Sequence, residues 1–351
     1  MRKVFIIALL PLIIFILNTN SMSAQNTTTY LSASQQGLIT VTALAAAGDM
    51  ENLNIQIPAA LDAGLSVSEI KEAFVQLYAY SGFPRSLNAI MALKAIVEQR
   101  SASGFKDAAG KADSPENNAT DKYEQGRRVL ETLTGTFQKK PAPGFGEFSA
   151  RIDAYLKEHL FGDIFSSDIL SFQQRELVTI AALAAMTGVA PQLKAHIGMG
   201  KNTGITENQL LEVAQLIEKH IGRRYANVML GLLHKPAIPL LDADKMVRIS
   251  AIEIVPQFKA EYLEILKEEA SASMKKEPGV IAIFPMENPA CENHIQIVEI
   301  YANKQAYEAH LQSPHFKYYK ESTLKMVQSL RLIDQTAIDA ETMADIFIKI
   351  K

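Results

Sequence analysis

The chain has 351 residues and a formal net charge of −3, so it lacks the strongly basic surface that binds nucleic acid. Its one cysteine, Cys291, excludes an internal disulfide and a paired-cysteine redox site. The length is sufficient for two or three domains.

Residues 1–24 have the features of a secretory signal peptide. A basic start, Met1 to Lys3, precedes an apolar run from Val4 to Leu17 and small polar residues that end near Ala24. The run is shorter than the roughly 20 apolar residues of a membrane span. We therefore expect a periplasmic or secreted protein that is free of the membrane once the signal is cleaved. The alternative is an uncleaved membrane anchor.

Two stretches about 140 residues apart share one pattern, which predicts an internal duplication. The first copy spans residues 25–105 and the second spans residues 123–238. Residues 106–122 between them are polar and aperiodic, and we interpret them as a linker. The apolar periodicity predicts helices in both copies. Matched positions are Leu38 and Leu177, Leu53 and Leu193, Gly64 and Gly204, Glu72 and Glu212, and Asn88 and Asn227.

The second copy carries a histidine that the first copy lacks. Its segment Leu177 to Met186 is apolar nearly all round and predicts a buried helix. Pro191 suits the first turn of the next helix, which carries His196. The first copy has Gln56 at that position, and glutamine can hydrogen-bond but cannot exchange protons. We interpret the first copy as a scaffold half.

Both copies resemble the carboxymuconolactone decarboxylase family, an all-α fold that also contains the alkylhydroperoxidase D-like proteins. The resemblance rests on RELVTIAALAA, QLKAH and NTGITENQLLE in the second copy and on GLSVSEIKEAFVQLYAYSGFPRSLNAI in the first. It implies a decarboxylase in which His196 protonates a carbon of the substrate. Dithiol peroxidase chemistry is not expected, because neither copy has the CxxC pair of that branch.

Two further residues of the second copy are candidates for the same site. Arg175 could anchor a substrate carboxylate through its planar fork, or could form a salt bridge on the helix surface. Glu212 recurs as Glu72 in the first copy, so it either orients a histidine or joins two helices by an ion pair. His196 itself could be a packed histidine without a chemical role.

From residue 245 to residue 340 the periodicity becomes that of an α+β domain. Helices are expected after Pro256, after Asn303 and after Ser313, where the last two residues act as N-terminal caps. The order β-α-β-β-α-β with a split second helix is typical of a ferredoxin-like fold. Residues 341–351 could add an edge strand to this sheet or to a partner's. The predicted strands are Val247–Ile254, Val280–Met286, His294–Tyr301 and Leu330–Ile338.

The segment YANKQAYEAHLQSPHFKYYKES, with EPGV at Glu277–Val280 and with Glu299, is similar to the antibiotic biosynthesis monooxygenase family, and most to its quinol monooxygenase-like members. The resemblance implies a small α/β barrel that dimerises by pairing sheets. It also implies oxidation of phenols or quinols by dioxygen without metal or flavin, although other members catalyse isomerisation. It makes His310 the principal polar group of this domain.

His315 is the predicted partner of His310. It lies in the first turn of the helix that Ser313 caps, where the helix field disfavours an imidazolium and so suits a neutral base. The alternative is that both histidines are packing residues. We expect no metal, because the two histidines have no acidic third ligand at a convincing spacing. We expect no other cofactor, because no glycine-rich nucleotide-binding loop is present.

Three functions remain open from the sequence. The first is an exported, cofactor-free oxidoreductase, a monooxygenase, that acts on a quinol-like or small carbonyl compound through residues 245–340. The second is a decarboxylase or lactone-processing enzyme that acts through the helical region. The third is a non-catalytic periplasmic protein that binds a small molecule or serves in assembly. The partner is a small-molecule substrate or ligand, and both resemblances imply a homo-oligomer.

Overall fold

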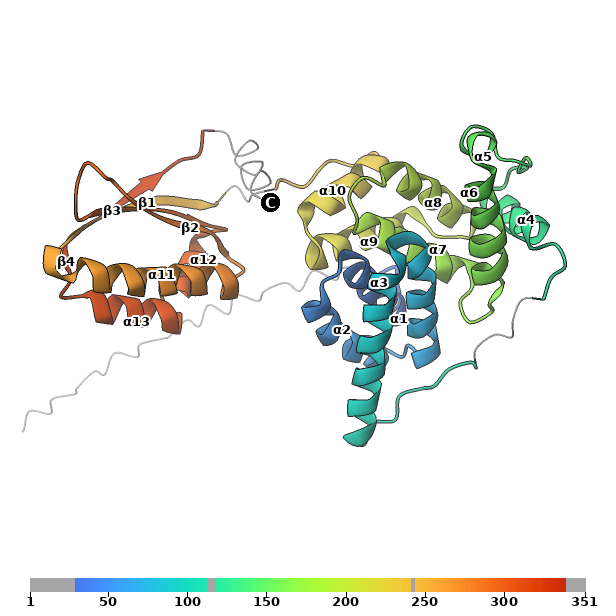
Figure 1. Ribbon diagram of the computed structural model, residues 1–351, viewed down its shortest axis with the longest axis horizontal. Helices are drawn as coiled ribbons and strands as arrows, with labels where there is room; N and C mark the ends of the chain where they lie inside the picture. The colour runs from blue at the N-terminus through green and yellow to red at the C-terminus, as the bar shows by residue number, and fades with distance from the viewer. Residues whose placement is uncertain (1–28, 113–117, 241–243, 339–351) are drawn as a thin grey trace, which may run out of the picture.

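The computed structural model describes residues 29–112, 118–240 and 244–338 (Figure 1). The predicted signal peptide and the predicted C-terminal edge strand lie outside these residues. None of the described helices combines the length and the apolar character that crossing a membrane requires. The described chain is helical up to residue 240 and contains its first strand at Met246.

The duplicated region is entirely helical in its described residues, which confirms the predicted fold class. The first copy consists of α1 (Ala33–Ala47), α2 (Met50–Asp62) and α3 (Val67–Ala102). The matching part of the second copy consists of α7 (Phe172–Ala184), α8 (Ala190–Asn202), α9 (Glu207–His220) and α10 (Arg223–Leu232). The two copies share one continuous hydrophobic core.

Glycines with positive φ end the helices at matching places in both copies. Gly64 and Gly204 follow α2 and α8 with φ of 95° and 93°, a conformation that glycine adopts at little cost. Gly82 interrupts α3 with φ of 81°, and Gly222 separates α9 from α10 with φ of 136°. Helix α3 is therefore the counterpart of α9 and α10 together.

The predicted second copy also includes the helical segment that precedes α7, made of α4 (Lys122–Thr134), α5 (Phe145–Phe148), α6 (Ala150–Ala154), the π-helix η1 (Tyr155–Asp163) and the short 3-10 helix η2 (Ile164–Ser166). Helix α4 packs against η1 so closely that a Cβ at Gly126 would lie 1.7 Å from the carbonyl oxygen of Lys157. The Lys157 ammonium is fully buried and pairs with Asp153 at 2.8 Å. The π-helix was not predicted.

Part of the predicted linker is attached to the first copy. The carbonyl groups of Ala108 and Ala109 accept hydrogen bonds from the backbone N–H groups of Val67 and Ser68. These two N–H groups belong to the first turn of α3, where a helix has no internal partners for them. The connection after α3 therefore folds back and supplies hydrogen-bond acceptors for the backbone N–H groups at the start of the same helix.

The copies exchange a reciprocal pair of contacts. Arg175 of α7 donates to the Glu72 carboxylate of α3 at 2.7 Å, and Gln36 of α1 donates to the Glu212 carboxylate of α9 at 3.0 Å. Gln36 and Arg175 occupy matching positions in the two copies, as do Glu72 and Glu212. The first helix of each copy thus contacts the third helix of the other copy, and such reciprocal contacts are typical of two units related by a twofold axis.

The α+β part confirms the predicted ferredoxin-like architecture. Its strands β1 (Met246–Ile254), β2 (Val280–Glu287), β3 (His294–Tyr301) and β4 (Val327–Gln335) form an antiparallel sheet in the order β2-β3-β1-β4. Beyond the short η3 (Pro256–Phe258), helices α11 (Lys259–Lys276) and α13 (Pro314–Thr323) lie along one face of the sheet, and α12 (Lys304–His310) connects to them (Figure 1).

The last strand begins earlier than predicted. It starts at Val327 rather than Leu330, because Val327 pairs with Ile254 across a register shift at the end of β1. Such an irregularity depends on pairing with a distant strand, and the local alternation of residues does not report it.

The face of the sheet that points away from the helices carries an apolar row. Phe284, Val298, Ile249 and Ile333 are direct cross-strand partners on this face. Phe284 is 63% exposed, and the other three residues are half-buried. Exposed apolar rows of this kind are typical of protein interfaces.

We predict that this apolar row pairs with the same row of a second copy. Ile249→Asp should convert a dimer to a monomer, because it places a charge in the centre of the row. Light scattering at micromolar concentration measures the change. Ser271→Asp adds the same charge to an exposed position of α11 and should leave the dimer intact. A monomeric wild type would contradict the prediction.

The buried Arg175–Glu72 pair should stabilise the helical region strongly. Arg175→Leu leaves the Glu72 carboxylate without its charged partner, so we expect a loss of about 3–5 kcal/mol in unfolding free energy. Lys94→Leu breaks the exposed pair with Glu98 and should cost about 1 kcal/mol or less. Denaturant unfolding of both variants tests this difference, and equal effects would disprove it.

Candidate functional site

The sheet and helices of the α+β part surround a cavity of about 520 Å³, which we call the inner cavity. Its walls are largely apolar and include Ile252, Leu266 and Phe316. Several polar groups converge on it from both the sheet and the helices. Those that matter below are Arg248, Ser250, Glu269, Glu299, Tyr301 and His310.

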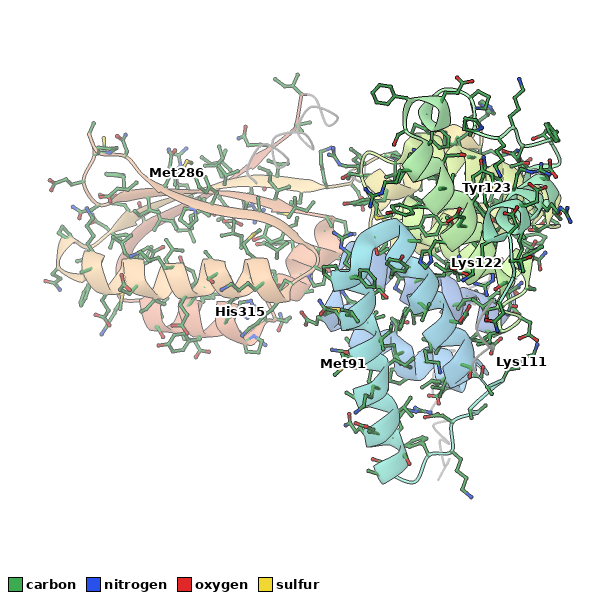
Figure 2. The ribbon with its side chains drawn as sticks, turned by 45° about the vertical axis from the view of Figure 1, so that its right-hand side comes forward. Met91, Lys111, Lys122, Tyr123, Met286 and His315 are labelled. Carbon is green, nitrogen blue, oxygen red and sulfur yellow. The ribbon has the colours of Figure 1, made fainter. Side chains whose placement is uncertain are left out.

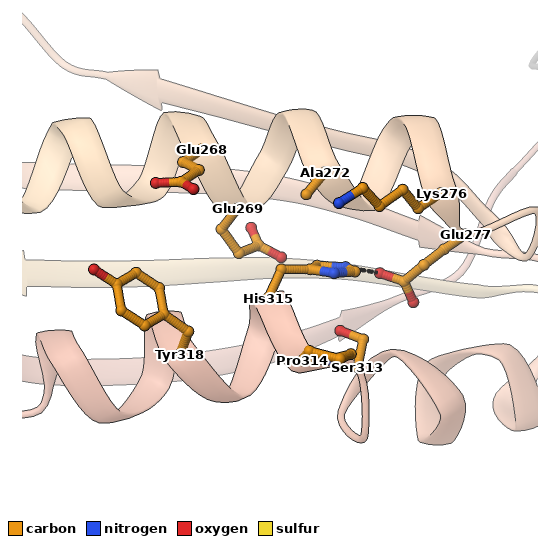
Figure 3. Close-up of a pocket in the computed structure, with 9 residues that line it drawn as sticks. All are labelled: Glu268, Glu269, Ala272, Lys276, Glu277, Ser313, Pro314, His315 and Tyr318. Atoms are coloured by element: carbon orange, nitrogen blue, oxygen red, sulfur yellow. Dashed lines mark hydrogen bonds and ion pairs between the residues drawn. The ribbon is translucent and has the colours of Figure 1, made fainter.

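A second hollow of about 540 Å³, the outer cleft, opens between α11 and α13 (Figure 3). It is lined by Glu268, Lys276, Glu277 and His315, among others. Figure 2 shows His315 on the helical side of the domain, away from Met286 of the sheet. Glu269 lines both the outer cleft and the inner cavity, so it belongs to the wall between them.

Glu277 joins the two predicted histidines through a single oxygen. Its Oε1 lies 3.0 Å from His310 Nδ1. The same oxygen lies 2.6 Å from His315 Nε2 (Figure 3). His310 ends α12 and is only 2% exposed, whereas His315 occupies the first turn of α13 behind Pro314. The structure thus places the Glu277 carboxylate between His310 and His315. His310 lines the inner cavity and His315 lines the outer cleft, so the two imidazoles face different hollows.

The protonation of Glu277 sets the tautomer of His310. Burial acts to raise the pKa of Glu277, but hydrogen bonds from His310 and His315 outweigh burial and hold this pKa below its ordinary value. The carboxylate is therefore an acceptor, and His310 donates to it through Nδ1–H. This assignment leaves Nε2 as the free nitrogen of His310.

Glu269 lies on the other side of the His310 ring. Its Oε1 is 3.8 Å from His310 Nε2 and accepts a hydrogen bond of 2.8 Å from the Ser273 hydroxyl. Burial raises the pKa of Glu269. The His310 imidazole therefore has an ionised carboxylate at Nδ1 and a carboxyl group with the opposite shift near Nε2.

Burial raises the pKa of two phenols of the cavity wall, Tyr301 and Tyr319, and so holds them in the neutral form. Tyr301 donates to Glu299 at 2.9 Å, and burial raises the pKa of Tyr301 well above its ordinary value. Tyr262 and Tyr319 share a hydrogen bond of 2.6 Å, and burial raises the pKa of Tyr262 to about 12. These tyrosines therefore keep their protons and do not donate them to His310 in place of a bound phenol.

Glu277, His310 and His315 also have the composition of a metal ligand set. One ligand atom from each lies within 4.8 Å of the others, and two imidazoles with one carboxylate suit zinc or iron. The sequence analysis found no acidic third ligand, because Glu277 lies 33 residues before His310 in the chain. The only feature of the sequence that pointed to Glu277 was its place in the EPGV segment, which is part of the family resemblance.

In the helical part, His196 has a carboxylate partner that the sequence analysis missed. His196 lies on α8 and is 6% exposed, and its Nδ1 is 2.8 Å from Oε2 of Glu176 on α7. Glu176 is fully buried, and its Oε1 has no hydrogen-bond partner among the described residues. The Tyr80 ring of the first copy packs edge-on against His196, at 5.5 Å between ring centroids.

The other two candidates of the helical part have different partners. Arg175 is fully buried rather than on the helix surface, and it donates to Glu72 and Gln76 across the two copies. Glu212 accepts from Gln36 and from the backbone N–H groups of Tyr30 and Leu31. It therefore joins the copies, whereas Glu176 is the residue that holds His196.

Comparison with known proteins agrees with the division of the chain into a helical part and a C-terminal α+β part. Residues 20–95 and 150–218 match the carboxymuconolactone decarboxylase family, and residues 246–322 match the antibiotic biosynthesis monooxygenase family. No curated protein matches the chain.

Solved structures resemble the C-terminal part. A candidate antibiotic biosynthesis monooxygenase from Bacteroides thetaiotaomicron is 48% identical over 27% of this chain and 91% of its own, with a TM-score of 0.27. One from Caulobacter crescentus is 16% identical over 27% and 92%, with a TM-score of 0.27. A candidate monooxygenase from Lactobacillus acidophilus is 24% identical over 35% and 64%, with a TM-score of 0.27. Two regions of the chain thus match the carboxymuconolactone decarboxylase family, and its C-terminal, monooxygenase-like domain belongs to the antibiotic biosynthesis monooxygenase family.

Proposed function

We propose that the C-terminal domain oxidises a quinol-like or other small phenolic compound with dioxygen in the inner cavity. The observation that carries the proposal is the position of His310 at the cavity wall, with Nδ1 held by Glu277 and Nε2 free. An imidazole held in one tautomer by a carboxylate is suited to accept a proton at its other nitrogen.

The cavity supplies the other requirements of this chemistry. A volume of about 520 Å³ accommodates a substituted aromatic ring, and the apolar wall excludes water from a reactive phenolate. In the net reaction a hydroquinone and dioxygen give a hydroxyquinone and water, so one oxygen atom enters the ring. This reaction needs no metal or flavin to balance, which agrees with the cofactor-free chemistry that the family resemblance implies.

The proposal includes export and self-association. The signal-like residues 1–24 support an enzyme of the periplasm or of the external medium. The apolar row on the outer face of the sheet supports a homo-oligomer formed through the C-terminal domains. Its partner in reaction is a small molecule and not a nucleic acid.

A second candidate function resides in the helical part. The buried His196–Glu176 pair supports a proton transfer during decarboxylation or processing of a lactone, with Glu176 Oε1 still free to accept a hydrogen bond. His196→Ala and His310→Ala in one activity assay separate the two enzymes. If neither substitution lowers turnover of any compound, the chain is a binding or assembly protein.

His310→Ala should lower quinol turnover about a hundredfold or more, the usual scale for loss of a proton-transfer group. Oxygen uptake by the purified full chain measures it. His294→Ala is the matched control, because His294 is exposed at the start of β3. Turnover that persists after His310→Ala would contradict this mechanism. Turnover that a chelator abolishes would also contradict it, and would favour a metal ion bound by Glu277, His310 and His315.

The Glu277 contacts should make stability depend on pH in the acid range. Because the folded-state pKa of Glu277 is lowered, its contribution is fully present above the ordinary glutamate value of about 4.3 and is lost as pH falls through the lowered pKa. The melting temperature of Glu277→Gln should therefore lie below that of wild type at about pH 6 and approach it below about pH 4. Exposed Glu292→Gln should show no such dependence.

A further inference from the structure

The wall between the outer cleft and the inner cavity brings together three side chains that can bind a metal ion. Glu277 follows the last turn of α11, His310 ends α12, and His315 lies in the first turn of α13. One oxygen or nitrogen atom of each side chain lies within 4.8 Å of the others. Two imidazoles and one carboxylate are a common ligand set of zinc and other divalent transition metals.

The distances between these atoms suit an ion after a small adjustment. Glu277 Oε1 is 3.0 Å from His310 Nδ1 and 2.6 Å from His315 Nε2. Zinc bonds of about 2.0–2.2 Å place neighbouring ligand atoms about 2.9–3.4 Å apart. The carboxylate oxygen would therefore have to move away from each of the two nitrogens by less than about 1 Å to admit the ion.

The turn between α12 and α13 fixes the two histidines relative to each other. The backbone N–H of Ser313 donates to the carbonyl of His310 at 3.0 Å, and the Ser313 hydroxyl accepts from the backbone N–H of Phe316 at 3.3 Å. The other ring nitrogen of His310, Nε2, lies 3.8 Å from Oε1 of Glu269. Histidines that bind a metal commonly direct their second nitrogen at such an oxygen, which orients the ring.

The outer cleft, with a volume of about 540 Å³, gives an ion access to this ligand set. Glu277 and His315 both line the cleft and meet in it (Figure 3). Glu268 and Glu269 line it as well, together with Lys276. Carboxyl groups thus outnumber ammonium groups among the residues of this lining, which favours a cation over an anion.

We propose that Glu277, His310 and His315 bind Zn²⁺ or a similar divalent transition-metal ion from the outer cleft, and that the bound ion inhibits oxidation in the inner cavity. The inhibition rests on the proposed function, whereas the metal site rests on the geometry alone. An imidazole that binds a metal through Nδ1 carries its ring proton on Nε2. His310 would then have no free nitrogen for the phenol proton, so an ion in the outer cleft would stop the reaction on the other side of the wall.

Calorimetric titration of the full chain with Zn²⁺ alone tests the site. His315→Ala removes a ligand and should weaken binding about a hundredfold or more, because loss of even an outer partner of a ligand typically weakens it about 10–100-fold. Glu277→Gln keeps the size of the side chain but removes its charge, and should also weaken binding. His294→Ala removes an exposed histidine of β3 and should bind Zn²⁺ as wild type does.

The melting temperature of each variant shows whether it is folded. Equal Zn²⁺ affinity in wild type and in folded His315→Ala or folded Glu277→Gln would overturn the proposal. So would a wild type that does not bind Zn²⁺ at micromolar concentration.

Oxygen uptake tests the inhibition separately. With a quinol that wild type oxidises, saturating Zn²⁺ should lower turnover about a hundredfold, the scale for loss of a proton-transfer group, and a chelator should restore it. His294→Ala should respond in the same way. Turnover that saturating Zn²⁺ leaves unchanged in wild type would overturn the inhibition. If wild type oxidises no quinol, the proposed function fails, and the Zn²⁺ titration still decides whether the metal site exists.

Discussion

Three buried groups of this protein are held by carboxylates that arrive from distant parts of the chain. Glu277 holds His310, Glu176 holds His196, and Glu72 holds Arg175. A buried charge or imidazole is costly unless such a partner compensates it, so each pair constrains the packing of the elements that carry it. The first pair fixes the wall of the inner cavity, and the last joins the two helical copies.

The helical copies have diverged at paired positions rather than at single ones. Where the second copy has His196, the first has Gln56, and where the second has Glu176, the first has Gly37. A Cβ at Gly37 would lie 3.2 Å from Ala60, so a glutamate there would require the helices to separate. The first copy thus lacks both the acid and the histidine, which agrees with its interpretation as a scaffold.

The elements themselves could be predicted because their signals are local. The predicted caps at Asn303 and Ser313 accept the expected hydrogen bonds, and the alternation of residues predicted both ends of β3 correctly. The π-helix η1 has no such local signal, since its wider turn follows from close packing against Gly126. Sequence therefore predicted the architecture better than the departures from regular geometry.

The residues of the candidate site could be predicted only where they lie together in one continuous segment of the sequence. His310 and His315 lie in one continuous motif, so the sequence gives them as a pair, but Glu277 and Glu269 come from the preceding helix and its end. Glu212 was a candidate because it recurs in both copies, yet its partner across the copies is Gln36. Recurrence thus indicated a contact that joins the two copies, whereas the carboxylate beside His196 belongs to Glu176, which does not recur.

The charges around the inner cavity bear on the substrate that it accepts. Arg248 lines the cavity, but its guanidinium already donates to Asp334 at 2.7 Å and lies over the Tyr307 ring. The Glu299 carboxylate faces the same space and accepts the Tyr301 hydroxyl. An exposed lysine, Lys320, lines the cavity as well, so the lining presents both a carboxylate and an ammonium group to a bound molecule. Under the proposed oxidation, the Lys320 ammonium would offset the negative charge that a quinol acquires once His310 has taken its proton.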